Sequence, residues 1–114
     1  MQMFKSLFGG SQYDIAGAEA QARLSSAQPP LVLDVRTKEE FRQGHIQGSL
    51  LIPLDELSRQ MQEVPTDREI LVICRSGARS GIATSQLRSA GYNAFNISGG
   101  LMSWMRSGLP VSRK

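Results

Sequence analysis

The single cysteine of this 114-residue chain, Cys74, is the residue whose type and setting most directly indicate chemistry. The apolar run 70–73 before it predicts a buried strand, and residues 80–89 after it predict a helix. The first turn of a helix leaves backbone N–H groups without partners, and the helix dipole is positive there. A thiol between a strand end and a helix start therefore predicts anion chemistry on sulfur.

The loop that follows the cysteine has the composition of an anion-binding concavity. Gly77 gives the backbone the freedom to curl, and the small side chains of Ser76, Ala78 and Ser80 leave the centre of the curl open. We therefore expect successive N–H groups to point inward around a Cys74 thiol that is open to solvent.

Two arginines of the same loop, Arg75 and Arg79, add positive charge, and a guanidinium fork suits oxyanions. Such surroundings should lower the pKa of Cys74. A fall from about 8.5 to about 6.5 raises the thiolate fraction at pH 7 from about 3% to about 75%, but it lowers nucleophilicity about eightfold. The net gain is only about threefold, so the loop should matter more for holding an anionic substrate and the anion formed on sulfur.

Each feature also has a plainer interpretation. Most cysteines are inert buried thiols, and Arg75 and Arg79 could be solvated surface charges. The occurrence of all these features in this order, between a strand and a helix, favours the functional interpretation.

The composition is that of one ordinary globular domain, with 40% hydrophobic and 20% charged residues. The net charge is +3, and the ten arginines among the thirteen cations are spread along the chain. This distribution favours a small anionic substrate and gives no indication of nucleic-acid binding, for which basic residues would cluster.

One cysteine excludes an internal disulfide framework and any metal site built from several cysteines. A solitary thiol is typical of a reducing compartment, so we expect a cytoplasmic protein. The run 50–54 is too short to span a bilayer, and residues 1–10 lack the apolar core of a signal peptide. We interpret 1–10 as a flexible N-terminal arm and 11–114 as the domain, and we expect a monomer because no long exposed apolar stripe is evident.

Strands are predicted at 13–15, 31–35, 49–52, 70–73 and 93–97, with helical segments between them. Thr37 and Glu40 form a capping box that starts one helix. The helix before Gly91 should bury Ile82, Ala83, Leu87 and Ala90, the pair 99–100 should be a turn, and the last helix should bury Leu101, Trp104 and Met105. Alternating strands and helices predict an α/β sandwich with a mostly parallel sheet, in which ligands bind beyond the carboxyl ends of strands such as 70–73.

Four segments in order resemble the rhodanese superfamily, specifically a single-domain rhodanese-like sulfurtransferase. They are Leu33-Asp34-Val35-Arg36 followed by Glu40-Phe41, then Gly44-His45-Ile46-Gln47-Gly48-Ser49 running into Ile52-Pro53, then the loop 74–80, and finally Gly99-Gly100 with Trp104. The resemblance covers about Ile15 to Pro110.

The resemblance implies a three-layer sandwich with a five-stranded, mostly parallel sheet and helices on both faces. It implies that Cys74 is the nucleophile, which takes sulfur from thiosulfate or a similar sulfane donor to form a persulfide. A thiophilic acceptor, such as cyanide or a thiol, then removes the outer sulfur in ping-pong fashion, with no metal or organic cofactor. The substrate-binding residues would be Arg75, Ser76, Gly77, Ala78, Arg79 and Ser80.

Several alternatives remain open at this stage. Phosphatases of this superfamily place five residues between cysteine and arginine, whereas four separate Cys74 from Arg79, which favours a sulfur atom over a phosphoryl group or arsenate. The protein could be a persulfide carrier in a relay between partner proteins, or a regulatory scaffold, although it retains the cysteine. We interpret His45, Asp34 and Arg36 as structural residues, and Trp104 as core.

Overall fold

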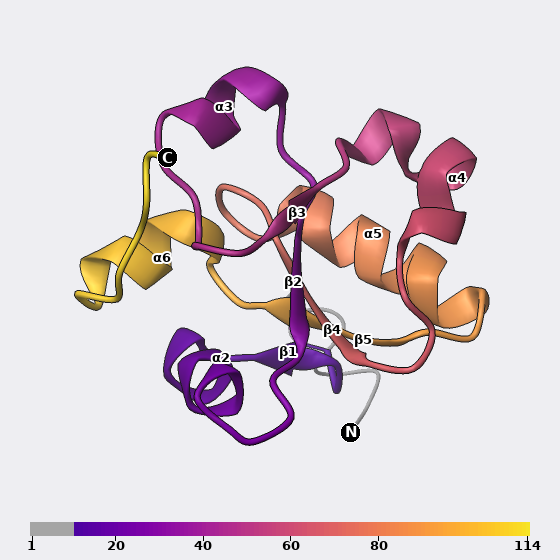
Figure 1. The fold of residues 1–114 in the computed structure, drawn as a ribbon, viewed down its shortest axis with the longest axis horizontal. Helices are drawn as coiled ribbons and strands as arrows, with labels where there is room; N and C mark the ends of the chain where they lie inside the picture. Colours follow the sequence, from indigo (N-terminus) through magenta and orange to yellow (C-terminus); the bar gives the residue numbers. More distant parts are fainter. Residues whose placement is uncertain (1–10) are drawn as a thin grey trace.

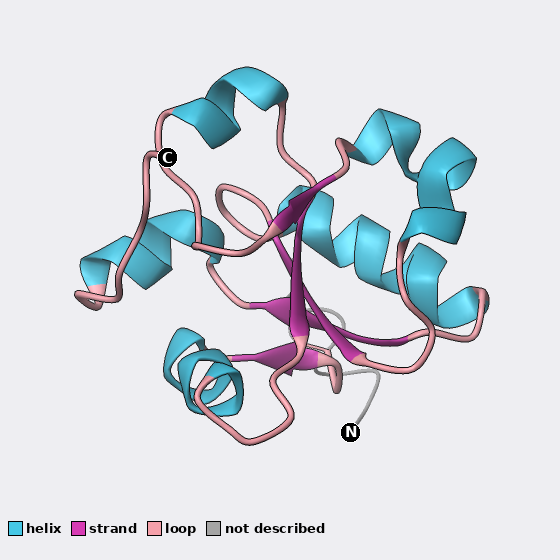
Figure 2. Ribbon diagram, in the orientation of Figure 1, coloured by secondary structure: helices cyan, strands magenta, loops and turns pink. Residues whose placement is uncertain are grey.

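The computed structural model describes residues 11–114, and the predicted arm 1–10 lies outside them. One five-stranded sheet with the order β1-β5-β4-β2-β3 forms the centre of the molecule, and every pairing in it is parallel. Figure 1 shows the arrangement, and Figure 2 separates strands from helices. The strands are β1 (Asp14–Ile15), β2 (Leu31–Asp34), β3 (Leu50–Leu51), β4 (Glu69–Ile73) and β5 (Asn93–Ile97). The α/β sandwich predicted from the sequence is therefore confirmed.

Helices cover both faces of the sheet and form the outer layers. They are α2 (Gly17–Leu24), α3 (Lys38–Arg42), α4 (Leu57–Gln60), α5 (Ala78–Ser89) and α6 (Gly100–Arg106), and the short 3₁₀ turns η1 (Leu54–Glu56) and η2 (Met61–Glu63) flank α4. Among residues 11–114, no helix has the length and apolar content that a membrane crossing requires.

The side chains of β4 alternate between two cores, because successive residues of a strand point to opposite faces. Ile70 and Val72 pack with residues of α4 and α5, whereas Leu71 and Ile73 pack with residues of α2 and α6. All four are fully buried, as expected for a central parallel strand covered on both sides. The alternation places Cys74, which follows Ile73, in the core on the α5 side.

The helix after the cysteine begins at Ala78, two residues earlier than the sequence predicted. Gly77 is its N-cap with φ +108°, and the Gly77 carbonyl already accepts a helical hydrogen bond from the Gly81 N–H. The loop is therefore only 74–77, and Arg79 and Ser80 belong to the first turn of α5. The positive φ explains the early start, because glycine adopts this conformation without steric cost.

The predicted buried faces of two helices need correction. In α5, Ser80, Ala83, Thr84 and Leu87 are buried, whereas Ile82 is 55% exposed and Ala90 is also exposed. The buried positions follow the i, i+3, i+4, i+7 spacing from Ser80, so the polar residue beside Cys74 sets the rotation of the helix.

The C-terminal helix shows the same kind of error. In α6, Leu101 and Trp104 are buried as predicted, but Met105 is 49% exposed. Gly100 is the first residue of this helix rather than part of a turn. The sequence predicted a turn because glycine pairs usually mark turns, and Gly100 does have a left-handed φ of +60° although it starts the helix.

Two local predictions about the carboxyl edge of the sheet hold. The capping box is present, since the Thr37 side chain accepts from the Glu40 N–H at 3.1 Å and the Glu40 carboxylate accepts from the Thr37 N–H at 3.0 Å. Asp34 and Arg36 form a buried ion pair of 2.8 Å at the end of β2, and Arg36 also donates to the Gly44 carbonyl at 2.7 Å. The pair braces the loop after α3, which agrees with the structural role expected for both residues.

His45 is also held by structural contacts. Its Nδ1 lies 2.7 Å from the Phe41 carbonyl oxygen, its ring stacks on the Phe41 ring at 3.7 Å, and its backbone pairs with Ser112. The side chain is buried, so these contacts fix the loop before β3 and the C-terminal segment.

Candidate functional site

The sulfur of Cys74 lies inside the turn that joins β4 to α5. The Gly77 N–H donates a hydrogen bond to Sγ at 3.0 Å, and the Ser80 hydroxyl lies 3.3 Å from it. The N–H groups of Ser76 and Ser80 also interact with the sulfur and help to lower the pKa of Cys74. The inward-facing amides that the sequence predicted are therefore present.

The first turn of α6 holds the backbone of this loop in place. The Cys74 carbonyl accepts from the Leu101 N–H at 2.8 Å, and the Arg75 carbonyl accepts from the Met102 N–H at 3.1 Å. In a planar trans peptide the C=O and N–H bonds point in opposite directions. Because the Arg75 carbonyl faces α6, the N–H of the same peptide, which belongs to Ser76, faces away from α6 and toward Sγ.

Glycine is required where the two segments meet. A Cβ on Gly100 would lie 2.4 Å from the Arg75 carbonyl oxygen and 2.6 Å from that of Cys74, and the residue has φ +60°. A Cβ on Gly77 would lie 3.3 Å from the Gly99 nitrogen. Close approach of the loop to α6 therefore depends on the absence of side chains at these positions.

One expectation about this site is wrong: the thiol is not open to solvent. Only 1% of Cys74 is exposed. Because α5 begins at Ala78, its first turn brings the Ser80 hydroxyl onto the sulfur, where a longer loop would have left space. A reactant must therefore enter the loop before it can touch Sγ.

The pKa of Cys74 lies below the ordinary value for a thiol, in the direction expected from the sequence. Burial raises the pKa, but hydrogen bonds from the Ser80 hydroxyl and from the N–H groups of Ser80, Gly77 and Ser76 outweigh it. These neutral dipoles at the start of α5 are the main cause of the lowering, and the charge of Arg79 also interacts with the sulfur, as the sequence argument expected.

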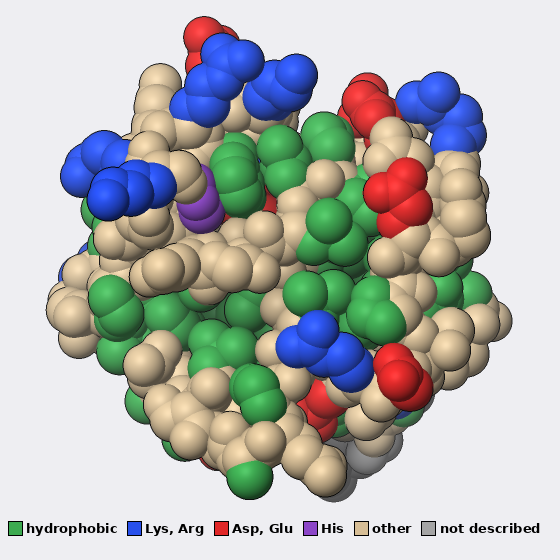
Figure 3. Space-filling view, in the orientation of Figure 1, with side chains coloured by type: hydrophobic (Ala, Val, Ile, Leu, Met, Phe, Trp, Pro, Cys, Tyr) green, Lys and Arg blue, Asp and Glu red, His purple; other side chains and the backbone are tan. Residues whose placement is uncertain are grey.

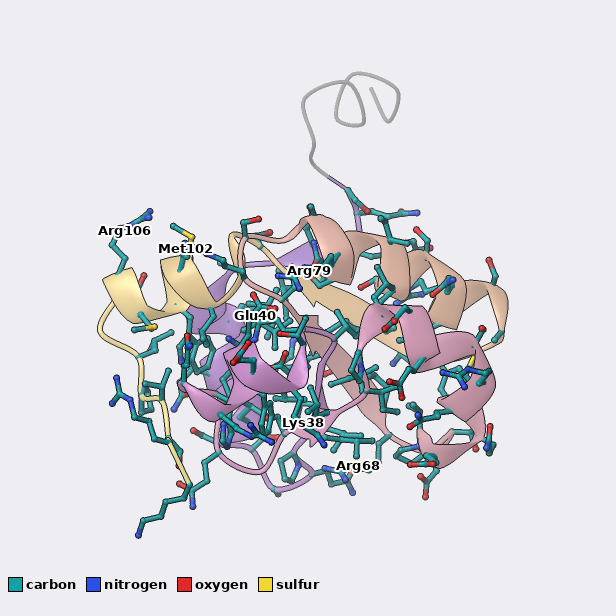
Figure 4. The ribbon with its side chains drawn as sticks, turned by 90° about the horizontal axis from the view of Figure 1, so that it is seen from above. Lys38, Glu40, Arg68, Arg79, Met102 and Arg106 are labelled. Atoms are coloured by element: carbon teal, nitrogen blue, oxygen red, sulfur yellow. The ribbon has the colours of Figure 1, made fainter. Side chains whose placement is uncertain are left out.

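Arg79 forms an ion pair with Glu40 of α3, as Figure 4 shows. Its two terminal nitrogens donate to the two carboxylate oxygens at 2.8 and 2.9 Å. The hydrogen bond from Arg79 lowers the pKa of Glu40 to about 2, and Glu40 in turn raises the pKa of Arg79. The fork expected to bind substrate oxyanions is thus already occupied by a carboxylate.

Arg75 is exposed and borders a hollow of about 310 Å³ beside the Cys74 loop. Arg36, Glu40, Arg113, Met102 and Met105 also line it, and Arg36 and Glu40 are each paired with an opposite charge. The hollow combines the charges of Arg75 and Arg113 with apolar surface, and Arg75 joins it to the loop that holds the sulfur.

A second hollow, of about 400 Å³, is more apolar and shares no residue with the loop 74–77. It is lined by Leu24, Leu31, Ile46 and Trp104, among others. Figure 3 shows hydrophobic side chains gathered across the middle of one face of the molecule. We assign this hollow no part in the site because none of its lining residues belongs to the Cys74 loop.

The site contains residues that sequence reasoning missed. Asn96 of β5 contacts Ser80, Asp14 of β1 contacts Asn96, and Glu40 neutralises Arg79. Glu40 stood in the motif that resembled the family, but its partner could not be read from spacing. Within residues 11–114, no three potential metal-ligating side chains come together.

Comparison with known proteins adds independent findings. The family model described as "Rhodanese-like domain" matches residues 17–107. A protein named "Sulfurtransferase" from Allochromatium vinosum is 37% identical over 99 residues, which cover 86% of this chain and 92% of that protein. The rhodanese-related protein from Thermoplasma volcanium, a solved crystal structure, superposes with a TM-score of 0.84 at 33% identity and covers 89% of this chain and 98% of its own.

Two further relatives carry more specific names. "Thiosulfate sulfurtransferase 18" of Arabidopsis thaliana is 35% identical over 96 residues, and the match covers 70% of each chain. The "Putative sulfur carrier protein YrkF" of Bacillus subtilis is 36% identical over 74 residues, which cover 64% of this chain but only 40% of that protein. The same kind of domain thus occurs alone and as part of longer chains.

The Gly100 contact leads to a first prediction. Gly100→Ala should lower the free energy of unfolding by about 2–4 kcal/mol, because the new Cβ meets two backbone carbonyls and the residue keeps a left-handed conformation. Gly108→Ala is the matched control, since Gly108 has φ +80° but open space around its Cβ position; it should lose only about 1–2 kcal/mol. Urea unfolding of both variants measures the difference, and equal losses would contradict the packing argument.

The Arg79–Glu40 pair leads to a second prediction, on the pH dependence of stability. A folded pKa of about 2 against an ordinary 4.5 means that ionised Glu40 stabilises the fold above pH 4.5, and that this contribution disappears as the pH falls toward 2. Glu40→Gln keeps the capping box but removes the charge, so it should cost about 1 kcal/mol at neutral pH and little at pH 2.

Glu39→Gln, an exposed neighbour on α3, serves as the control. Its stability curve should stay parallel to that of the parent protein in urea unfolding between pH 2 and pH 7. A Glu40→Gln curve that also stays parallel would show that the Arg79–Glu40 pair does not contribute to stability.

Proposed function

The chain belongs to the rhodanese-like domain family of sulfurtransferases, and on that premise we propose that it moves sulfane sulfur from thiosulfate, or from a persulfide donor, to a thiophilic acceptor through a persulfide on Cys74. The observation that carries the proposal is the sulfur nucleophile held by inward-facing amides at the N-terminus of α5. Cyanide or a low-molecular-weight thiol would serve as acceptor.

The first half-reaction begins with the Cys74 thiolate, which attacks the outer sulfur of thiosulfate. A bond forms between Sγ and that sulfur, the S–S bond of thiosulfate breaks, and its electron pair leaves with sulfite. The products are sulfite and a Cys74 persulfide anion. In the second half-reaction cyanide attacks the outer sulfur, the Sγ–S bond breaks, and thiocyanate leaves while the thiolate returns.

The oriented N–H groups around Sγ would also stabilise the persulfide intermediate. The outer sulfur of a persulfide lies about 2.0 Å beyond Sγ and carries the negative charge. The N–H groups of Ser76, Gly77 and Ser80 act on Sγ itself, and the Gly77 N–H donates to it at 3.0 Å, so we expect them to reach the neighbouring outer sulfur as well. Because these dipoles are already oriented by the fold, they stabilise the anion without reorganising during the reaction.

Burial of Cys74 also bears on the choice of donor. Since only 1% of the residue is exposed, the atom under attack must enter the loop. The terminal sulfur of thiosulfate is a single protruding atom, and the sulfonate at its other end can remain near Arg75 in the adjoining hollow. A phosphoryl or arsenate group, with three oxygens around the central atom, would need a wider loop and a free Arg79 fork, which Glu40 occupies.

The proposal predicts that thiosulfate makes the isolated protein one sulfur atom heavier, with the added sulfur on Cys74. Addition of cyanide should then release thiocyanate and restore the original mass. Cys74→Ser should do neither, because a serine hydroxyl forms no persulfide. Intact-mass spectrometry and a thiocyanate assay measure both steps, and equal turnover by the serine variant would refute the assignment.

A second candidate function, sulfur delivery to a partner protein, is favoured by the surface beside the loop. Met102 is 43% and Met105 49% exposed on α6, and Figure 4 shows Met102 on the outer side of that helix. Both residues line the hollow that contains Arg75 and Arg113. Exposed methionines provide an adaptable apolar contact, and the arginines around them suit an acidic partner.

In a relay, Met102→Ser combined with Met105→Ser should leave loading by thiosulfate unchanged but slow transfer to an acidic protein thiol by about tenfold, through weaker docking. Ile82→Ser is the control, because Ile82 is similarly exposed but lies on α5. Transfer is measured as the mass gain of the acceptor. Unchanged transfer in the double variant would favour a stand-alone enzyme over a relay component.

A further inference from the structure

A chain of hydrogen bonds connects the edge strand β1 to the sulfur of Cys74. The Asn96 side-chain amide of β5 donates from Nδ2 to the Asp14 carboxylate at 3.0 Å. The Ser80 hydroxyl lies 2.5 Å from Asn96 Oδ1 and 3.3 Å from Cys74 Sγ. Ser80 is fully buried and Asn96 is 7% exposed, so the Ser80–Asn96 contact is shielded from solvent, whereas Asp14 is half-buried at the edge of a hollow of about 360 Å³.

Chemistry fixes the direction of this chain. An ionised carboxylate only accepts hydrogen bonds, so Asn96 must turn Nδ2 toward Asp14 and Oδ1 toward Ser80. Oδ1 is also only an acceptor, so the contact of 2.5 Å requires the Ser80 hydroxyl to donate. That hydroxyl has a single proton, for which Oδ1 and Sγ therefore compete.

We propose that Asp14 and Asn96 are positioning residues that restrain ionisation of Cys74 by directing the Ser80 proton away from its sulfur. In the thiol form every hydrogen-bonding group is satisfied, since the Ser80 hydroxyl donates to Asn96 and its oxygen can accept from the thiol. In the thiolate form the sulfur needs the Ser80 proton, and supplying it leaves two oxygen lone pairs facing each other. Asn96 therefore reduces the share of thiolate stabilisation that the Ser80 hydroxyl can supply.

Such a restraint has a use in the proposed sulfur transfer, on which its functional meaning rests. The Ser80 hydroxyl, when it donates to the sulfur, and the amides of Ser76, Gly77 and Ser80 lower the pKa of Cys74, and a thiolate of lower pKa is a weaker nucleophile. The attacking thiol performs best when its pKa is near the ambient pH. A competing acceptor for the Ser80 proton limits how far the amides weaken the nucleophile.

The other charged groups near Cys74 take no part in this chain of hydrogen bonds. Arg79 of α5 is paired with Glu40 of α3, Asp34 and Arg36 are paired at the end of β2, and Arg75 is exposed. The strand β5 and the first turn of α6 contribute no titratable side chain. Asp14 is thus the charge that acts through Ser80, and its direct field must be separated from its effect on the hydroxyl.

The experiment measures the pKa of Cys74 from the pH dependence of thiolate ultraviolet absorbance, with no sulfur donor present. Asn96→Ala keeps the Asp14 charge but removes the competing acceptor, so the Ser80 proton becomes available to the sulfur. We expect the pKa to fall by about 1, the effect of one hydrogen bond to a charged group. Thr84→Val is the control, because Thr84 loses a buried hydrogen bond to the Ser80 carbonyl without touching the chain; it should leave the pKa unchanged.

The Ser80→Ala background decides whether the effect passes through the hydroxyl. In that background, Asn96→Ala should no longer change the pKa. An unchanged pKa in Asn96→Ala alone, or the same fall with and without Ser80, would overturn the proposal.

Asp14→Ala, at the sheet edge, gives the same test if Asn96→Ala does not fold. Its effect through the chain vanishes in the Ser80→Ala background, whereas a direct charge effect persists. Persulfide loading is measured separately, so a failure of sulfur transfer would not be mistaken for a failure of the hydrogen-bond chain.

Discussion

Two backbone hydrogen bonds, from the start of α6 to the carbonyls of Cys74 and Arg75, are the constraint on which the rest of the site depends. They turn these carbonyls toward α6, and the Ser76 N–H, which shares a peptide with the Arg75 carbonyl, therefore faces the other way, toward the sulfur. The contact requires Gly100, whose missing side chain allows the loop to approach α6. The glycine pair at 99–100 therefore shapes the surroundings of the Cys74 sulfur from a segment about 25 residues further along the chain.

The electrostatics of the site follow from this backbone arrangement. The sulfur is buried and would by itself resist ionisation, yet oriented amides and the Ser80 hydroxyl make the thiolate accessible. Arg79, which precedes Ser80, forms its ion pair with Glu40 and so connects α5 to α3. Neutral dipoles therefore surround the sulfur most closely, whereas Arg75 and Arg113 line the adjoining hollow.

The fold could be predicted well from the sequence because the signals for it are local. Apolar β-branched runs such as 31–35 and 70–73, and the capping box at Thr37 and Glu40, express their structure within a few residues. The buried faces of the helices were harder to predict from the sequence. Ile82 and Met105 were expected to be buried on spacing alone, but the contacts of Ser80 with Cys74 and of Trp104 with the sheet core decide which side faces inward.

The sequence by itself determined the element order, the position of Cys74 after the central strand, and the kind of loop that surrounds it, because each depends on neighbouring residues. The tertiary structure alone decided that the thiol is buried, that Glu40 pairs with Arg79, that Asp14 contacts Asn96, and that Asn96 contacts Ser80. The residues of these three contacts are 39, 82 and 16 positions apart in the sequence, respectively. Their meeting depends on strand order and helix rotation, which come from packing the whole sheet and leave no signature in local spacing.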